Sequence, residues 1–153
     1  MAALKARGFV MPPQRRLTGQ VGAGHVGAGP DGRGAGWMSP DELLLILPYA
    51  AVAQTLDALC NALKGKHFLA VDVSDARAVF RVEGARSAQV LAKLCPVDLP
   101  RLEKDELRRT RAAQVAVAFW ADDAGYTLVS FRSVADYVMG LLRHAARPGS
   151  ALE

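Results

Sequence analysis

The sequence has few of the features that mark exported, membrane-spanning or disulfide-bonded proteins. It has only two cysteines, Cys60 and Cys95, and both fall in apolar helical patterns. Two cysteines in a chain without an export signal are more often reduced core residues than a disulfide. The N-terminus carries Lys5 and Arg7 but no continuous apolar core, and the longest uncharged apolar stretch, 43–56, is too short for a membrane span. We therefore expect a cytoplasmic protein without a disulfide.

The chain also lacks a strong excess of charge of either sign. Its formal net charge is +4, half of its residues are hydrophobic and 22% are charged, which is typical of a folded globular protein. A nucleic-acid binder is suggested only by Arg108, Arg109 and Arg111, and these arginines are not interleaved with aromatic residues or set in a known module. The composition therefore gives no support to a nucleic-acid or membrane partner.

Glycine is scarce except at the front of the chain, where nine of the fourteen glycines precede Trp37. Glycine at that density costs too much backbone entropy for a regular element, so 18–36 is predicted to be a loop or linker. We expect a poorly ordered segment over 1–36, one α+β domain over 37–147 and a short tail over 148–153. Deleting 2–34 is accordingly predicted to change stability by no more than about 1 kcal/mol.

From Trp37 onward, hydrophobic periodicity predicts alternating strands and helices. Strands are expected where apolar residues run together or alternate, and helices where they recur at intervals of three and four. The last helix has Ser133 as its expected N-cap, with Asp136 three residues later. The order favours an antiparallel or mixed sheet with helices on one face. The expected strands are 43–47, 67–73, 77–82, 112–120 and 126–132, the last two joined as a hairpin, and the expected helices are 52–63, 88–95 and 133–145.

No motif supplies a convincing active site. The glycine spacing of 22–27 matches a dinucleotide fingerprint, but no buried strand precedes it and no helix can follow it. Ser133 is explained as a helix cap, and no histidine is positioned by sequence to activate it. The remaining candidates are three scattered histidines and three loop-associated acidic groups, so we predict no catalytic, cofactor-binding or metal residue in this chain. These residues are His25, His67 and His144, Asp72 with Asp75, Glu103 with Asp105 and Glu106, and Asp122 with Asp123.

Several runs of residues between Trp37 and Ala146, in a fixed order along the chain, carry a family resemblance. They are Trp37–Leu45, Val71–Arg77, Leu91–Leu99, Arg111–Trp120 and Phe131–Tyr137. Together they resemble the gamma subunit of heterotetrameric sarcosine oxidase and its aminomethyltransferase-like relatives. The chain departs from that family over 20–36, which is mostly glycine and alanine here.

The resemblance implies an aminomethyltransferase-like fold and a non-catalytic place in a complex that demethylates sarcosine to glycine. It implies an alpha chain as the direct partner, with beta and delta chains in the same complex. FAD, FMN, NAD and zinc are expected in the partner chains, and tetrahydrofolate is expected to accept the methyl carbon. The alternative is a stand-alone folate-binding protein of the same fold. Aromatic residues near predicted loops are the candidate interface anchors, namely Trp37, Tyr49, Trp120 and Tyr126.

Overall fold

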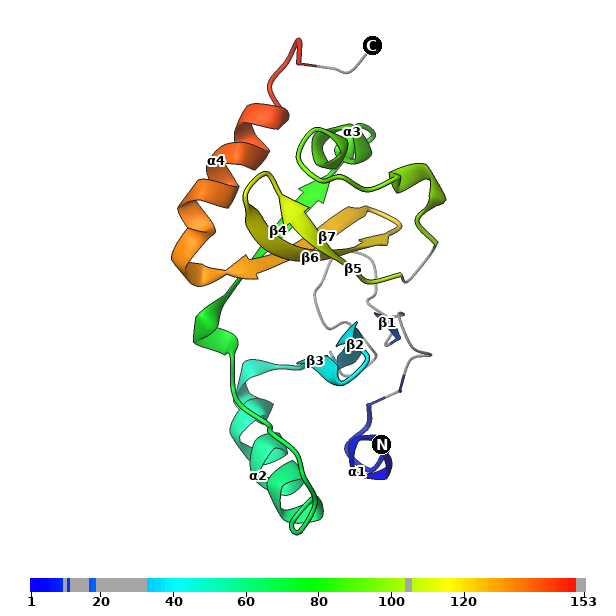
Figure 1. Ribbon diagram of the computed structural model, residues 1–153, viewed down its shortest axis with the longest axis vertical. Coiled ribbons are helices and arrows are strands. Elements are labelled where there is room, and N and C mark those ends of the chain that lie inside the picture. The colour runs from blue at the N-terminus through cyan, green and yellow to red at the C-terminus, as the bar shows by residue number, and fades with distance from the viewer. Residues whose placement is uncertain (10, 12–16, 19–32, 104–105, 151–153) are drawn as a thin grey trace. The chain divides into compact units, whose positions relative to one another are not determined.

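The computed structural model describes residues 1–9, 11, 17–18, 33–103 and 106–150 of the chain. It divides into two compact units, Met1–Asp75 and Ala76–Glu153. Each unit contains its own sheet (Figure 1), and every strand pair in the described residues is antiparallel. The predicted α+β class is therefore confirmed, with antiparallel rather than mixed sheets.

The sheet of the first unit has three strands in the order β1-β2-β3. They are β1 (Leu17–Thr18), β2 (Gly34–Ser39) and β3 (Glu42–Ile46), and β3 agrees with the strand predicted over 43–47. The prediction that Gly34 and Gly36 lie in a loop is wrong, because both belong to β2. Pairing on both sides, with β1 and β3, satisfies the β2 backbone and offsets the entropy that its glycines lose.

Short helical elements complete the first unit. The α1 helix (Ala2–Lys5) precedes β1, and a 3₁₀ turn, η1 (Tyr49–Ala51), leads into α2 (Val52–Ala62), which confirms the helix predicted there. Phe9, which follows α1, is buried, and the Arg33 guanidinium lies 5.6 Å from its ring centre. The front of the chain thus contributes a buried aromatic side chain, and deleting 2–34 would remove it.

The segment 67–73 is not a strand, although its apolar residues predict one. No helix, strand or turn is assigned from Phe68 to Val73, and the chain reaches the 3₁₀ turn η2 (Ser74–Ala76) as coil (Figure 1). The prediction failed because no described strand pairs with this segment, and a strand needs a neighbour to satisfy its backbone. Residues 74–76 connect this coil to the next strand as the 3₁₀ turn η2.

The second unit is built on a four-stranded sheet in the order β4-β7-β6-β5. Its three neighbouring pairs are all antiparallel, and β6 and β7 form the predicted hairpin, with Asp122 opposite Gly125. The strands are β4 (Arg77–Glu83), β5 (Arg108–Ala112), β6 (Val115–Asp122) and β7 (Gly125–Phe131). The helices are α3 (Ser87–Ala92) and α4 (Ala135–Ala145), with 3₁₀ turns η3 (Leu99–Arg101) and η4 (Arg132–Val134).

The core of this unit lies between one face of the sheet and the two α-helices. Alternate residues of the strands point to this face and pack with the apolar sides of α3 and α4, which Figure 1 shows on the same side of the sheet. Pro96 follows soon after α3 ends, as expected, and buried Cys95 belongs to the core. The largest buried contributors are Phe80, Phe119 and Leu128 from the sheet, Leu91 from α3, and Val138 with Leu142 from α4.

Two local predictions in this unit are wrong. The run 112–120 is not one strand, because Ala113 adopts a left-handed conformation (φ 50°) in a tight turn between β5 and β6. Ser133 does not cap α4, since it lies inside η4 and the residue before the helix, Val134, makes no side-chain cap hydrogen bond. A 3₁₀ turn has taken the place of a side-chain cap at this helix start.

None of the helices in the described part of the chain is both long enough and apolar enough to span a bilayer.

Candidate functional site

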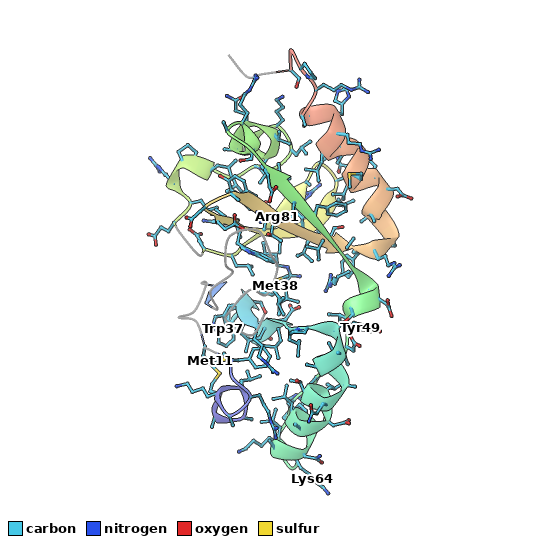
Figure 2. The ribbon with its side chains drawn as sticks, turned by 180° about the vertical axis from the view of Figure 1, so that it is seen from behind. Met11, Trp37, Met38, Tyr49, Lys64 and Arg81 are labelled. Carbon is cyan, nitrogen blue, oxygen red and sulfur yellow. The ribbon has the colours of Figure 1, made fainter. Side chains whose placement is uncertain are left out.

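A connected group of polar side chains lies where β4, β6 and β7 meet at the hairpin end of the second sheet. Arg81 of β4, labelled in Figure 2, donates from Nη1 to Asp122 Oδ2 at 2.6 Å and from Nη2 to Oδ1 at 3.1 Å. It also donates to Thr127 Oγ1 and, at 3.1 Å, to Glu83 Oε1. A single guanidinium therefore ties the edge strand β4 to both strands of the hairpin.

Asp122 is held from two directions. Its side chain is only 5% exposed, and its Oδ1 also accepts hydrogen bonds from the backbone N–H groups of Ala124 (2.9 Å) and Gly125 (3.1 Å). Burial alone would raise the pKa of Asp122, but the hydrogen bonds from Arg81 and from these two amides outweigh burial and lower it. The hydrogen bond with Asp122 in turn raises the pKa of Arg81.

This arrangement fixes charge rather than moving protons. A general acid or base works best with a pKa near the operating pH, whereas the Asp122 carboxylate and the Arg81 guanidinium are each shifted further into their charged forms. The carboxylate closes the β6–β7 turn and the guanidinium spans the strands. We therefore read the cluster as a structural clamp.

A shallow, open depression of about 450 Å³ lies beside this clamp. Its lining comes from the hairpin turn and from the loop and first residues of α3, including Gly84, Ser87, Asp122 and Tyr126. The Tyr126 phenol is neutral at physiological pH, and burial raises its pKa further above the ordinary value. Besides this phenol and the already paired Asp122, the lining contains Ser87 and Asp123, the second carboxylate of the predicted Asp122–Asp123 pair.

The other candidate residues are dispersed over the surface of the chain. His67, His144 and Ser133 are all exposed. Among the described residues, neither histidine belongs to a group of side chains that could hold a metal ion. Asp72 accepts hydrogen bonds from Ser74 Oγ (2.6 Å) and Ser74 N–H (2.8 Å), and the Ser74 hydroxyl lowers its pKa. These contacts stabilise the turn that precedes β4.

The remaining predicted groups do not converge either. Glu106 accepts a hydrogen bond from the Glu103 N–H at 3.2 Å and pairs with Arg108. His25, Asp105 and the glycine run 22–27 lie outside the described residues. In the described part of the chain, no three His, Cys, Asp or Glu side chains are grouped so that they could hold a metal ion.

Both cysteines are free thiols, and they differ in environment. Cys95 is buried and burial raises its pKa to about 11. Cys60 is exposed on α2, so the expectation that it is a core residue is wrong. A thiol with a pKa this high carries almost no thiolate at neutral pH, and the thiolate is the nucleophilic form. Cys95 is therefore a packing residue, which agrees with its predicted role.

The four predicted aromatic anchors occupy three kinds of environment. Tyr49 in η1 is exposed (Figure 2), Trp37 is half-buried, and Tyr126 packs edge-on against Phe119 with ring centres 6.0 Å apart. Trp120 is fully buried, and its Nε1–H has no hydrogen-bond partner among the described residues. Of the four, Tyr49 alone is largely available to a partner.

Several exposed apolar side chains escaped the sequence analysis because their pattern placed them in strands or helices. In the first unit, Leu69 is 86% exposed and Val71 is 59% exposed, and Phe68 precedes them. In the second unit, Val79 and Phe131 are half-exposed on adjacent strands, and the Arg77 guanidinium lies 4.2 Å from the Phe131 ring centre. Exposed apolar groups of this kind are typical of protein–protein contact surfaces.

Comparison with known proteins identifies the family. A family model described as "Sarcosine oxidase, gamma subunit family" matches residues 21–147. The sarcosine oxidase subunit gamma of Corynebacterium sp. (strain U-96) is 34% identical over 99 residues, and that of Arthrobacter sp. is 32% identical over 99 residues. Each alignment covers 63% of this chain. The alignments cover 47% and 48% of the two relatives, so the chain spans about half the length of the curated relatives it matches.

A solved structure agrees with this assignment. A chain of the heterotetrameric sarcosine oxidase from Corynebacterium sp. U-96, in complex with pyrrole 2-carboxylate, superposes with a TM-score of 0.78 at 28% identity. The superposition covers 99% of this chain and 75% of that chain. Because the family model covers most of the sequence, the resemblance drawn from the collinear motifs is confirmed: the chain belongs to the sarcosine oxidase gamma subunit family.

Proposed function

We propose that this chain is a non-catalytic subunit of a heterotetrameric sarcosine oxidase and supports the oxidative demethylation of sarcosine to glycine by its partner chains. The observation that carries the proposal is the likeness, over 99% of this chain, to a chain of a heterotetrameric sarcosine oxidase. The described polar side chains are consistent with such a role. Arg81, Asp122 and Asp72 are engaged in contacts that hold strands and turns together.

The proposal assigns the chemistry of the complex to other chains. The alpha chain is the direct partner, with beta and delta chains in the same assembly. FAD, FMN, NAD and zinc belong to those partners, and tetrahydrofolate receives the methyl carbon there. The chain itself keeps an aminomethyltransferase-like fold as a scaffold, and the assembly works in the cytoplasm. Exposed apolar residues such as Tyr49 and Leu69 support a role in contact with other subunits.

Co-expression of the four chains, with and without this one, tests the proposal. The expected result is that omitting this chain lowers the yield of assembled complex in size-exclusion chromatography, while sarcosine-dependent peroxide release per mole of the complex that does form is retained. Adding the purified chain back should restore the yield. Normal assembly without it would contradict the scaffold role.

A second measurement separates the stand-alone folate-binding alternative. Titration of the isolated chain with tetrahydrofolate in a calorimeter is expected to give no heat of binding. Saturable one-to-one binding by the isolated chain, together with normal assembly in its absence, would favour the alternative.

A further inference from the structure

We propose that the segment Phe68–Val73 is the docking element of this chain, and that it adds as a strand to an exposed sheet edge of a partner subunit. The inference rests on the proposed function, because it takes the occupant to be another chain of the heterotetramer. The family name implies assembly with other subunits, and Phe68–Val73 is the surface that we infer for it.

The first observation is the exposure of apolar side chains on this segment. Leu69 is 86% exposed and Val71 is 59% exposed, so most of both side chains faces solvent in the isolated chain. They are two residues apart, which places them on one side of an extended chain, while Ala70 between them is half-buried. One side of the segment is therefore an apolar strip without a described cover.

The second observation concerns the backbone. Within the described residues, no N–H or carbonyl group from Phe68 to Asp72 takes part in a backbone–backbone hydrogen bond; the Val73 carbonyl leads into the 3₁₀ turn η2. In this segment the Asp72 side chain accepts two hydrogen bonds from Ser74, and neither of them engages the backbone of Phe68–Asp72. A row of free donors and acceptors beside exposed β-branched and apolar side chains is complementary to the edge of a sheet.

These two observations together point to a strand edge rather than an apolar groove as the occupant. A groove would cover Leu69 and Val71 but would leave the backbone groups to be buried without partners, at a substantial cost. An edge strand would cover the two side chains and would also form hydrogen bonds with the backbone groups. Lys66 precedes the segment and Asp72 lies within it. These charges further favour a partner edge with an acidic residue opposite Lys66 and a basic residue opposite Asp72.

The free edge of β4 is a weaker candidate for the same role. It is one of the two edge strands of its sheet, but three of its seven residues, Arg77, Arg81 and Glu83, are charged. Charged side chains on an edge strand are a common protection against pairing with other chains. The apolar segment 68–73 contains one charged residue, Asp72, and lacks that protection.

Hydrogen–deuterium exchange on the isolated chain and on the assembled complex tests the backbone part of the proposal. In the isolated chain the amides of 69–73 should exchange rapidly, because no described hydrogen bond protects them. In the complex they should become protected by roughly 100-fold or more, in the alternating pattern of an edge strand. Unchanged rapid exchange in a complex that contains this chain would overturn the docking proposal and leave the proposed function intact.

Substitution tests the side-chain part. The double variant Leu69→Ser/Val71→Ser should fold normally on its own, since both side chains are exposed, yet bind its partners about 100-fold more weakly in a pull-down titration. Tyr137→Ser/Met139→Ser, a pair of exposed apolar residues on α4, is the matched control and should bind like the wild type. Equal losses from both pairs, or no loss from the first, would overturn the proposal.

Two further outcomes separate the occupants. Failure of the wild-type chain to join the other subunits at all would overturn the proposed function together with this inference. Protection of 69–73 in the isolated chain at high concentration, accompanied by a dimer in light scattering, would show that a second copy of this chain is the occupant. That result would overturn the docking proposal, because the proposal commits to a partner subunit.

Discussion

Removing the Asp122 carboxylate tests how far the clamp at the hairpin end holds the second unit together. Asp122→Ala deletes two hydrogen bonds from Arg81 and two from the backbone amides of Ala124 and Gly125. It also leaves the partly buried Arg81 guanidinium without its main partner. Because the lost acceptor is 95% covered, the cost should approach that of breaking a buried ion pair, about 3 kcal/mol in the free energy of unfolding.

A matched control uses the second carboxylate that contacts the same guanidinium. The Glu83 side chain is 54% exposed and lies 3.1 Å from Arg81 Nη2, so Glu83→Ala should cost between 0 and about 1 kcal/mol. Urea unfolding followed by tryptophan fluorescence measures both variants. A Trp37→Phe background leaves Trp120, which is fully buried in β6, as the reporter of the second unit.

The pH dependence of a further variant, Asp122→Asn, gives the sign of the effect. Since the folded pKa of Asp122 is lowered, its contribution to stability is fully present above the unfolded pKa, near 4, and is lost as the pH falls through the folded value. The difference in unfolding free energy between the wild type and Asp122→Asn should therefore shrink from pH 7 to pH 3. A difference that stays constant over this range, or a cost of Asp122→Ala below about 1 kcal/mol at pH 7, would refute the clamp.

The other predictions concern glycine geometry, thiol reactivity and the front of the chain. Gly125→Ala would place a Cβ atom 2.2 Å from the Val82 carbonyl oxygen at a positive φ, so thermal unfolding should show a loss of about 2 kcal/mol or more in the free energy of unfolding. In Gly140→Ala the new Cβ atom in α4 meets nothing within 4 Å, so this variant should gain about 1 kcal/mol in the free energy of unfolding. With a thiol reagent at pH 8, Cys60 should react at once and Cys95, whose pKa is about 11, only after unfolding; equal rates would contradict the buried environment of Cys95. Phe9→Ala should destabilise the first unit by about 3 kcal/mol in urea unfolding, and no change would support the original expectation that 1–36 adds little.

Elements whose stability depends on residues close in sequence were predicted well. The β6–β7 hairpin has two apolar runs joined by a polar, glycine-containing turn, and both the pairing and its position are confirmed. The α2 helix is confirmed for a similar reason, because its apolar residues recur at helical spacing. In each case the turn or period specifies the element before any distant contact is made.

The errors occur where a distant partner decides the conformation. Gly34 and Gly36 were assigned to a loop on their intrinsic flexibility, but pairing with β3 holds them in β2. Ser133 is a residue type that often caps helices, yet the 3₁₀ turn η4 leads into α4 without a side-chain cap. The Arg81–Asp122 clamp escaped notice because its two residues are 41 positions apart and meet only when β4 is registered against β7.

The predicted strand at 67–73 failed for a different reason from the other errors. Its alternating apolar residues have the composition of a strand, as do those of β6, but β6 has neighbours on both sides and 67–73 has none among the described strands. Alternating apolar residues favour a strand, and a strand needs a paired neighbour, but the pattern does not specify which chain provides that neighbour. In a family of subunits, an apolar strand pattern left exposed and unpaired within its own chain is therefore a reason to look for its partner on another chain.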